Sequence, residues 1–108
     1  MADLNFSRVE EGNLYYDYGM VFDASIDFAR SDEGAVDWTA KTIKMEITND
    51  RDRTPVIETL TSGSEITIAT NRLTFDHTFT ELNNRAYWFL IYNDTDDIAI
   101  RQGWLIPQ

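Results

Sequence analysis

Few side chains in this sequence could do chemistry, and a lone histidine is the first to consider. His77 directly follows Asp76. A serine-type hydrolytic site needs a carboxylate that orients the histidine ring. Because successive residues of a β-strand point to opposite faces, Asp76 cannot orient His77, and we interpret His77 as a packed histidine at the rim of the core. An acid–base pair of Asp76 and Glu58 would need a cleft, which the spacing does not predict.

Hard oxygen ligands are concentrated in the segment Asn93-Asp94-Thr95-Asp96-Asp97. Such oxygens suit calcium, but the segment lacks the glycine and the distant bidentate glutamate of an EF-hand. We therefore expect no cofactor and no metal, and we keep calcium at Asp94, Asp96 and Asp97 as the alternative. The chain also has no cysteine, so a thiol nucleophile and a cysteine-ligated metal are excluded. Together these observations predict a protein that is not an enzyme.

The net charge of the chain limits the classes of partner that it is expected to bind. The 108 residues include 19 acidic and 9 basic side chains, which give a formal net charge of -10. Binding to nucleic acid and to anionic membranes depends on clustered Lys and Arg, so we expect neither partner. The first residues, MADLNFSRVEEGN, lack the basic start and the continuous apolar run of a secretory signal. We therefore expect synthesis in a cytoplasm.

Alternating apolar and polar residues predict β-strands along most of the chain. Residues 20–28, 43–47 and 73–79 each place apolar side chains on one face. Residues 86–92, AYWFLIY, are apolar on both faces, which is typical of a central strand that is covered on both sides. Gly103 is expected to interrupt the last strand. The residues assigned to the core face of the first three runs are Met20, Phe22, Ala24, Ile26, Phe28, Ile43, Met45, Ile47, Leu73, Phe75 and Phe79.

This spacing predicts an all-β fold, a single antiparallel β-sandwich of about seven or eight strands. The sandwich is expected to span residues 18–108. Residues 1–17 do not show the same alternation of apolar and polar residues, and two interpretations stay open for them. They form either an arm that orders on another subunit or an extra edge strand of their own domain.

Aromatic residues exceed what one face of a small sandwich must bury. The alternation within residues 86–92 places Trp88 and Tyr92 on the face opposite Tyr87 and Phe89. Exposed Trp and Tyr are typical anchors of protein interfaces and of sugar-binding surfaces. We therefore predict an interface formed by this outer face and the N-terminal arm, with Leu4, Phe6, Tyr15, Tyr16, Trp88, Tyr92 and Trp104 as its residues.

A structural corner is expected at Val36-Asp37-Trp38-Thr39, between the first two alternating runs. Asp37 can accept hydrogen bonds from backbone amides two residues further on, and Thr39 can cap the turn. Trp38 can cover the end of the core. We predict a structural role for these three residues and no catalytic one.

Four motifs follow one another around this corner: Gly19-Met20-Val21-Phe22, Ile26-Asp27-Phe28, Asp32-Glu33-Gly34 and Val36-Asp37-Trp38-Thr39. In this order they resemble the small immunoglobulin-like β-sandwich domains of tailed-bacteriophage structural proteins, including the N-terminal domain of baseplate upper proteins. The likeness covers about residues 14–106. It departs from the family pattern at Ala40, where the family usually has glycine.

The resemblance implies an immunoglobulin-like fold and a function without catalysis. The chain would be a bacteriophage virion structural protein, an accessory or connector subunit of the capsid, neck or baseplate. Its partners would be other virion proteins or further copies of itself, and its location would be the virion after synthesis in the host cytoplasm. The alternative is a carbohydrate-binding or adhesion module, in which Trp88, Tyr92 or Trp104 would stack on a sugar ring.

Overall fold

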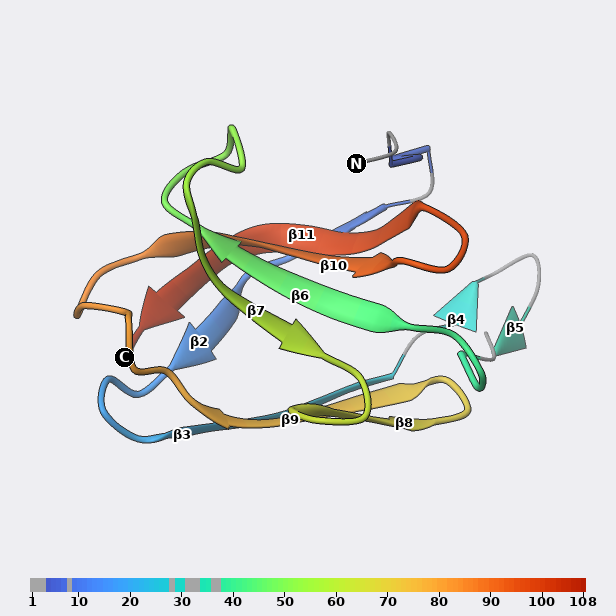
Figure 1. Cartoon of the computed structure of the whole chain (residues 1–108), viewed down its shortest axis with the longest axis horizontal. Coiled ribbons are helices and arrows are strands. Elements are labelled where there is room, and N and C mark those ends of the chain that lie inside the picture. The colour runs from blue at the N-terminus through green and yellow to red at the C-terminus, as the bar shows by residue number, and fades with distance from the viewer. Residues whose placement is uncertain (1–3, 8, 28, 31–33, 36–37) are drawn as a thin grey trace.

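The computed structural model describes residues 4–7, 9–27, 29–30, 34–35 and 38–108, and for residues 29, 30, 34 and 35 it describes the backbone alone. All regular secondary structure in these ranges is β-strand, which confirms the predicted all-β class. Two sheets lie one above the other (Figure 1). None of the described residues belongs to a helix that could cross a membrane.

The larger sheet has the strand order β1-β11-β10-β6-β7, and β2 also pairs with β11. Its central strand β10 is antiparallel to both neighbours, whereas β1 and β2 run parallel to β11 at one edge. The N-terminal residues therefore supply edge strands to this sheet. Its strands are β1 (Glu10–Glu11), β2 (Leu14–Tyr16), β6 (Ile43–Thr48), β7 (Val56–Thr61), β10 (Tyr87–Asn93) and β11 (Ile98–Pro107).

The smaller sheet is antiparallel and has the order β3-β9-β8. A separate short pair, β4 (Ala29–Arg30) with β5 (Gly34–Ala35), follows β3 in the chain. The strands of the smaller sheet are β3 (Val21–Asp27), β8 (Ile66–Ala69) and β9 (Arg72–Thr78).

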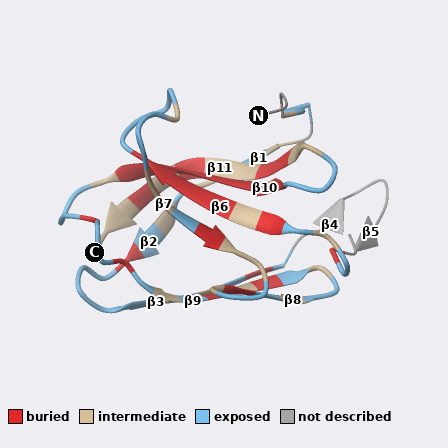
Figure 2. Ribbon diagram, viewed as in Figure 1, coloured by how far each residue is buried: buried red, intermediate tan, exposed pale blue. Residues whose placement is uncertain are grey.

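The main core fills the space between the two sheets (Figure 2). Each large apolar side chain that is fully buried there contributes about 1.5–3 kcal/mol, and with no cysteine in the chain the fold depends on this packing. Apart from Met20, alternation in the strands selects the core residues as expected, and Phe28 lies outside the described residues. The inward residues of the longer strands include Phe22, Ile26, Ile43, Met45, Ile47, Leu73, Phe75, Tyr87, Phe89 and Ile91.

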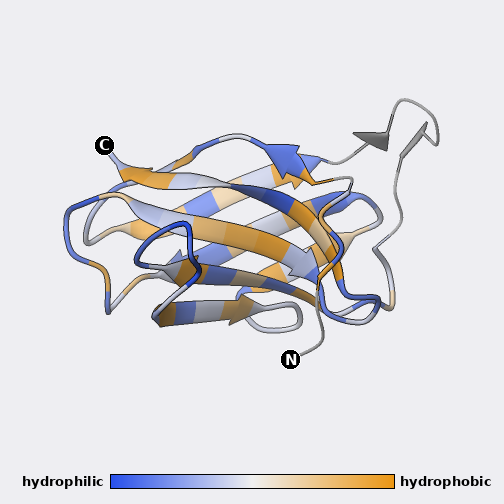
Figure 3. Ribbon diagram, turned by 90° about the horizontal axis from the view of Figure 1, so that it is seen from above, coloured by the Kyte–Doolittle hydropathy of each residue, from blue (hydrophilic) through white to orange (hydrophobic). Residues whose placement is uncertain are grey.

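The central strand β10 is buried on both faces, as its composition predicts. All seven of its residues are buried, and hydrophobic residues run along the larger sheet in the view from above (Figure 3). On the outer face, Leu90, Tyr92 and Ala99 form a second apolar cluster, against which Leu4 and Val9 pack. The N-terminal residues thus cover the side of β10 that faces away from the main core.

Two local expectations were wrong. Met20 is 65% exposed instead of lying in the core, because β3 begins at Val21 and Met20 belongs to the preceding turn. Gly103 does not interrupt the last strand, since β11 runs without a break from Ile98 to Pro107. A Cβ atom at Gly103 would collide with the backbone of Gly12, so glycine at this position permits the close approach of the N-terminal residues.

Candidate functional site

Among the described residues, four of the six exposed large hydrophobic side chains lie between residues 15 and 21, around the connection between β2 and β3. Tyr15, Tyr18, Met20 and Val21 are 53%, 54%, 65% and 52% exposed. Scattered single apolar residues are normal on protein surfaces, whereas a concentration of them marks an interaction surface. We therefore take these four residues, called the end patch, as the candidate functional site.

Two core residues, Tyr16 and Phe22, determine how the strand residues of the end patch point. The hydroxyl of Tyr16 lies 2.7 Å from the backbone oxygens of both Asn83 and Arg85, which share its single proton as acceptors, and its ring lies in the core. Phe22 is also a core residue. Because neighbouring strand residues point to opposite sides, Tyr15 points away from the core on the larger sheet and Val21 points away from it on the smaller sheet.

The turn between the two strands exposes the other two residues of the end patch. The backbone N–H of Met20 donates to the oxygen of Asp17 at 3.0 Å, and Gly19 has a φ of 81°. Glycine adopts this left-handed conformation without strain. The C-terminus lies at the same end of the sandwich (Figure 1), where the N–H of Gln108 donates to the oxygen of Tyr16 at 2.9 Å.

The residues predicted for an interface do not lie together on one free surface. Tyr16, Trp88 and Tyr92 are buried within the chain, and Leu4 packs on the second apolar cluster. Tyr15 and Phe6 are exposed, at 53% and 38%. The outer face of the larger sheet is therefore largely covered by the chain itself.

Trp104 is half-buried beside Trp88 on this outer face. The two rings meet edge to face, with centroids 5.1 Å apart and planes at 81°. The guanidinium of Arg51, from the β6–β7 loop, lies 5.1 Å from the Trp88 ring centroid. A cation over an indole ring is attracted by the ring electrons, so this loop also helps to cover Trp88.

A buried carboxylate lies next to these aromatic residues. Glu46 is 5% exposed, and its Oε1 accepts a hydrogen bond from Arg53 Nη2 at 3.2 Å. The Tyr92 hydroxyl donates to Glu46 Oε2 at 3.1 Å. Both carboxylate oxygens are thus engaged in a covered position, which suits a structural role and gives a substrate no access.

The Glu46–Tyr92 contact should appear in the pH dependence of stability. Burial and the neighbouring Glu46 carboxylate raise the pKa of the Tyr92 hydroxyl well above its ordinary value of 10.0. Above that pH the unfolded chain loses the Tyr92 proton while the folded chain keeps it. Since the folded state then binds more protons, stability is full below pH 10.0 and falls as the pH rises above it.

We expect Tyr92→Phe to lose less stability than the unaltered protein between about pH 9 and about pH 11. Urea unfolding followed by circular dichroism at several pH values measures this difference. The matched variant Tyr15→Phe removes an exposed hydroxyl and should keep the full alkaline loss. Identical pH profiles for Tyr92→Phe and the unaltered chain would contradict the prediction.

The only histidine of the chain is paired across the two sheets. His77 Nε2 on β9 lies 2.9 Å from Glu58 Oε1 on β7, and Glu58 Oε2 accepts from the backbone N–H of Glu81 at 3.1 Å. A histidine–carboxylate pair is one part of a hydrolytic site. Among the described residues, however, no hydroxyl group is hydrogen-bonded to His77, and the pair serves to tie the sheets together. Sequence spacing gave no signal for this partner, because Glu58 and His77 lie on different strands.

The acidic loop between β10 and β11 is organised by its own side chains. The Asn93 side-chain oxygen accepts from the backbone N–H groups of Thr95 and Asp96, at 2.9 and 3.1 Å. Lysines engage two carboxylates, Lys41 with Asp96 at 2.9 Å and Lys44 with Asp94 at 3.3 Å. The hydrogen bond from Lys41 lowers the pKa of the Asp96 carboxyl. The calcium alternative at Asp94, Asp96 and Asp97 stays a prediction, with two of its ligands engaged by cations of the chain.

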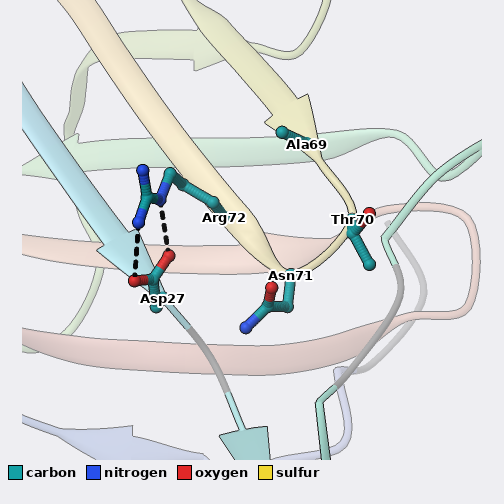
Figure 4. A pocket seen from close by; sticks show the side chains of 5 residues that line it. All are labelled: Asp27, Ala69, Thr70, Asn71 and Arg72. Atoms are coloured by element: carbon teal, nitrogen blue, oxygen red, sulfur yellow. Dashed lines mark hydrogen bonds and ion pairs between the residues drawn. The ribbon is translucent and has the colours of Figure 1, made fainter.

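An open pocket of about 370 Å³ lies where β3 ends beside the β8–β9 turn. Figure 4 shows its lining residues, Asp27, Ala69, Thr70, Asn71 and Arg72. Arg72 donates two hydrogen bonds to the Asp27 carboxylate, at 2.7 and 3.1 Å, and hydrogen bonding from Arg72 lowers the pKa of that carboxyl. The two charged residues neutralise one another, so neither is aimed at a charged ligand.

The predicted corner is described only in part, because Asp37 lies outside the described residues. Trp38 is buried in the main core, and its backbone N–H donates to the oxygen of Thr70 at 2.7 Å. Thr39 is exposed. Ala40 follows with a φ of 68°, a left-handed conformation that favours glycine.

Comparisons of this chain with protein-family models, with curated proteins and with solved structures gave no match. Any functional assignment therefore depends on the geometry described above and on the motifs in the sequence.

Sequence reasoning missed three residues of the end patch, Tyr18, Met20 and Val21. A signal was present in the Asp17-Tyr18-Gly19 segment, because Asp and Gly are both typical turn residues. Once the turn is recognised there, Met20 falls outside the strand and becomes exposed. Because the strand was expected to begin at residue 20, Met20 was assigned to the core and its exposure was not predicted.

Proposed function

We propose that this chain is a non-enzymatic structural module of a bacteriophage virion, which acts through protein–protein assembly in the capsid, neck or baseplate. The single observation that carries an assembly role is the end patch, with Tyr15, Tyr18, Met20 and Val21 each more than half exposed. Exposing apolar side chains to water is unfavourable. A partner surface that covers them would remove this cost.

The strand order supports the finer assignment to an immunoglobulin-like topology. Immunoglobulin domains pack one sheet with the order G-F-C, extended by C′ in variable-type domains, against another that contains B, E and D. Here β11-β10-β6-β7 corresponds to the first order and β3-β9-β8 to the second. This correspondence is at the level of fold, and folds of this kind carry many functions.

The corner supports the likeness to phage structural domains. The family usually has glycine where this chain has Ala40, and Ala40 adopts a left-handed φ of 68°. Glycine is the residue that adopts such a φ without strain. The backbone conformation at this position is therefore the one that the family's glycine favours, although the side chain differs.

The carbohydrate-binding alternative lacks a supporting observation. Sugar stacking needs a flat and accessible aromatic face. Trp88 and Tyr92 are 5% and 4% exposed, and Trp104 is half-buried with its ring perpendicular to that of Trp88. These rings are engaged within the chain.

Purified particles test the proposed function. We expect the chain to co-sediment with phage particles through a density gradient at a constant copy number, measured by quantitative mass spectrometry against the major capsid protein. Detection only in the soluble part of the lysate would contradict a virion role. A soluble protein carried over by chance would vary in copy number between preparations, which serves as the internal control.

A further inference from the structure

The N-terminal segment, defined here as residues 4–7 and 9–16, is attached to one strand of the fold. Its backbone pairs in parallel with β11, from Asn5 beside Ile98 to Tyr16 beside Pro107. The N–H of Asn5 donates to the oxygen of Asp97 at 2.8 Å, and the N–H of Ala99 donates to the oxygen of Asn5 at 2.9 Å. The segment therefore lies along the whole edge that β11 would otherwise leave open.

Side chains of the segment fill defined places on the rest of the chain. Tyr16 enters the main core and Leu14 packs against it, while Leu4 and Val9 cover the second apolar cluster. An identical segment from a second copy would fit the same places, because the complementarity is already present within one chain. The free edge of β11 would otherwise expose unpaired backbone groups.

The connection after this segment has the features of a hinge. Residues 17–20 reverse the chain between β2 and β3 through one backbone hydrogen bond, from Met20 N–H to the oxygen of Asp17 at 3.0 Å. Tyr18 and Met20 have more than half of their surface exposed, so their side chains add little to the closed turn. Opening the turn itself would break this hydrogen bond and few side-chain contacts, while the contacts of the segment with β11 and the core would form again on the second copy.

We propose that two copies of this chain exchange their N-terminal segments, so that the segment of each pairs with β11 of the other. Residues 17–20 act as the hinge, where Tyr18 and Met20 of the two copies come together. Exchange keeps every contact between the segment and β11 and adds the burial of these two exposed side chains. The inference rests on the proposed assembly role and names a second copy as the partner.

A cysteine pair distinguishes exchange from the closed chain, since the natural sequence has no cysteine. Tyr15 and Ile106 are register partners on β2 and β11, and neighbouring strands lie about 4.8 Å apart, within the span of a disulfide. The variant Tyr15→Cys/Ile106→Cys is refolded at high concentration and oxidised, and its mass is measured without reductant. Exchange predicts a covalent dimer.

The control pair is Ser25→Cys/Thr74→Cys, whose natural side-chain oxygens lie 3.2 Å apart on β3 and β9. Both residues belong to the body of the sandwich, so this pair should link within one chain whether or not the segments exchange. A monomer linked within itself by the Tyr15–Ile106 pair would overturn the proposal. So would a dimer in solution whose Tyr15–Ile106 links stay within each chain.

A hinge variant gives a second readout. Gly19 has a φ of 81° and Gly63, in the β7–β8 turn, has a φ of 89°, and a Cβ at either position meets open space. Alanine is strained in both turns, but only the Gly19 strain is relieved when the hinge opens. Gly19→Ala should raise the association constant of the dimer roughly tenfold or more, and Gly63→Ala should leave it unchanged. An equal response of both variants would overturn the hinge.

Failure of the exchange and failure of the proposed function give different results. A chain that links only within itself, yet co-sediments with particles at a constant copy number, would lose the exchange and keep the virion role. A covalent dimer that is absent from particles would do the opposite.

Discussion

Glu46→Ala is expected to lower the free energy of unfolding by about 3 kcal/mol, out of a total of about 5–15 kcal/mol for a domain of this kind. The substitution removes the acceptor of both Arg53 and Tyr92. It leaves the Arg53 guanidinium, whose side chain is 25% exposed, without its counter-charge. A covered charge that loses its partner costs more than the pair contributed. Urea unfolding at neutral pH measures the loss.

Two controls separate burial from charge. Glu46→Gln keeps an oxygen that can accept a hydrogen bond and should cost less, about 1–2 kcal/mol. Asp27→Asn breaks an ion pair whose two side chains are each 56% exposed, and such surface pairs contribute little. A loss for Asp27→Asn as large as that for Glu46→Ala would contradict the importance of burial. So would an unchanged midpoint for Glu46→Ala.

Gly103→Ala is expected to lower the free energy of unfolding by about 2 kcal/mol. The added Cβ would collide with the Gly12 carbonyl oxygen, would lie 2.8 Å from the Gly12 carbonyl carbon, and would lie 3.2 Å from Asn13 Oδ1. That Asn13 oxygen accepts a hydrogen bond from the N–H of Trp104 at 3.0 Å. Since the obstacles are mainly backbone atoms, the N-terminal segment must move away from β11. Hydrogen exchange of the amides in β11 reports this movement.

Gly12→Ala is the matched control at the facing position. Its added Cβ would meet the guanidinium end of Arg101, a flexible side chain that can move aside. We expect a loss below about 1 kcal/mol and little change in exchange along β11. Equal effects of the two alanine substitutions would contradict the close backbone approach at Gly103.

Much of the fold could be predicted because alternation and burial agree within the longer strands. Residues 43–47 and 73–79 place their apolar side chains in the core as the pattern indicates. The composition of residues 86–92 correctly predicts a strand that is buried on both sides. In these segments, a shift of the strand pairing by one residue would expose all the apolar side chains to water. The register of the strands is therefore strongly specified.

The N-terminal residues could not be assigned from alternation because their pairing is interrupted. β1 and β2 are two and three residues long and pair in parallel with β11, which leaves too few consecutive residues for a period to show. Within β2, Tyr16 points into the core and Tyr15 points outward. Only the tertiary contact with β11 determines which of these two neighbouring residues points inward.

The candidate site was predicted least well, for a physical reason. Trp88 and Tyr92 were expected to belong to an interface on the outer face, but they are covered by residues of the same chain that are distant in sequence, including Leu4 and Val9 near Tyr92 and Arg51 beside Trp88. A sequence shows which residues prefer burial, and it does not show which segment covers them. The end patch was found from the opposite observation, apolar side chains that are more than half exposed.

The central claim is that the end patch joins this chain to its neighbours in a particle. The most direct measurement compares Tyr18→Ser/Met20→Ser with Val56→Ser, a variant of an apolar residue that is 51% exposed at the start of β7. Copies of each variant per gradient-purified particle are counted by quantitative mass spectrometry, after circular dichroism establishes that both fold. We predict a loss of roughly tenfold or more for the end-patch variant and no loss for Val56→Ser. Equal copy numbers for the two variants would contradict the claim.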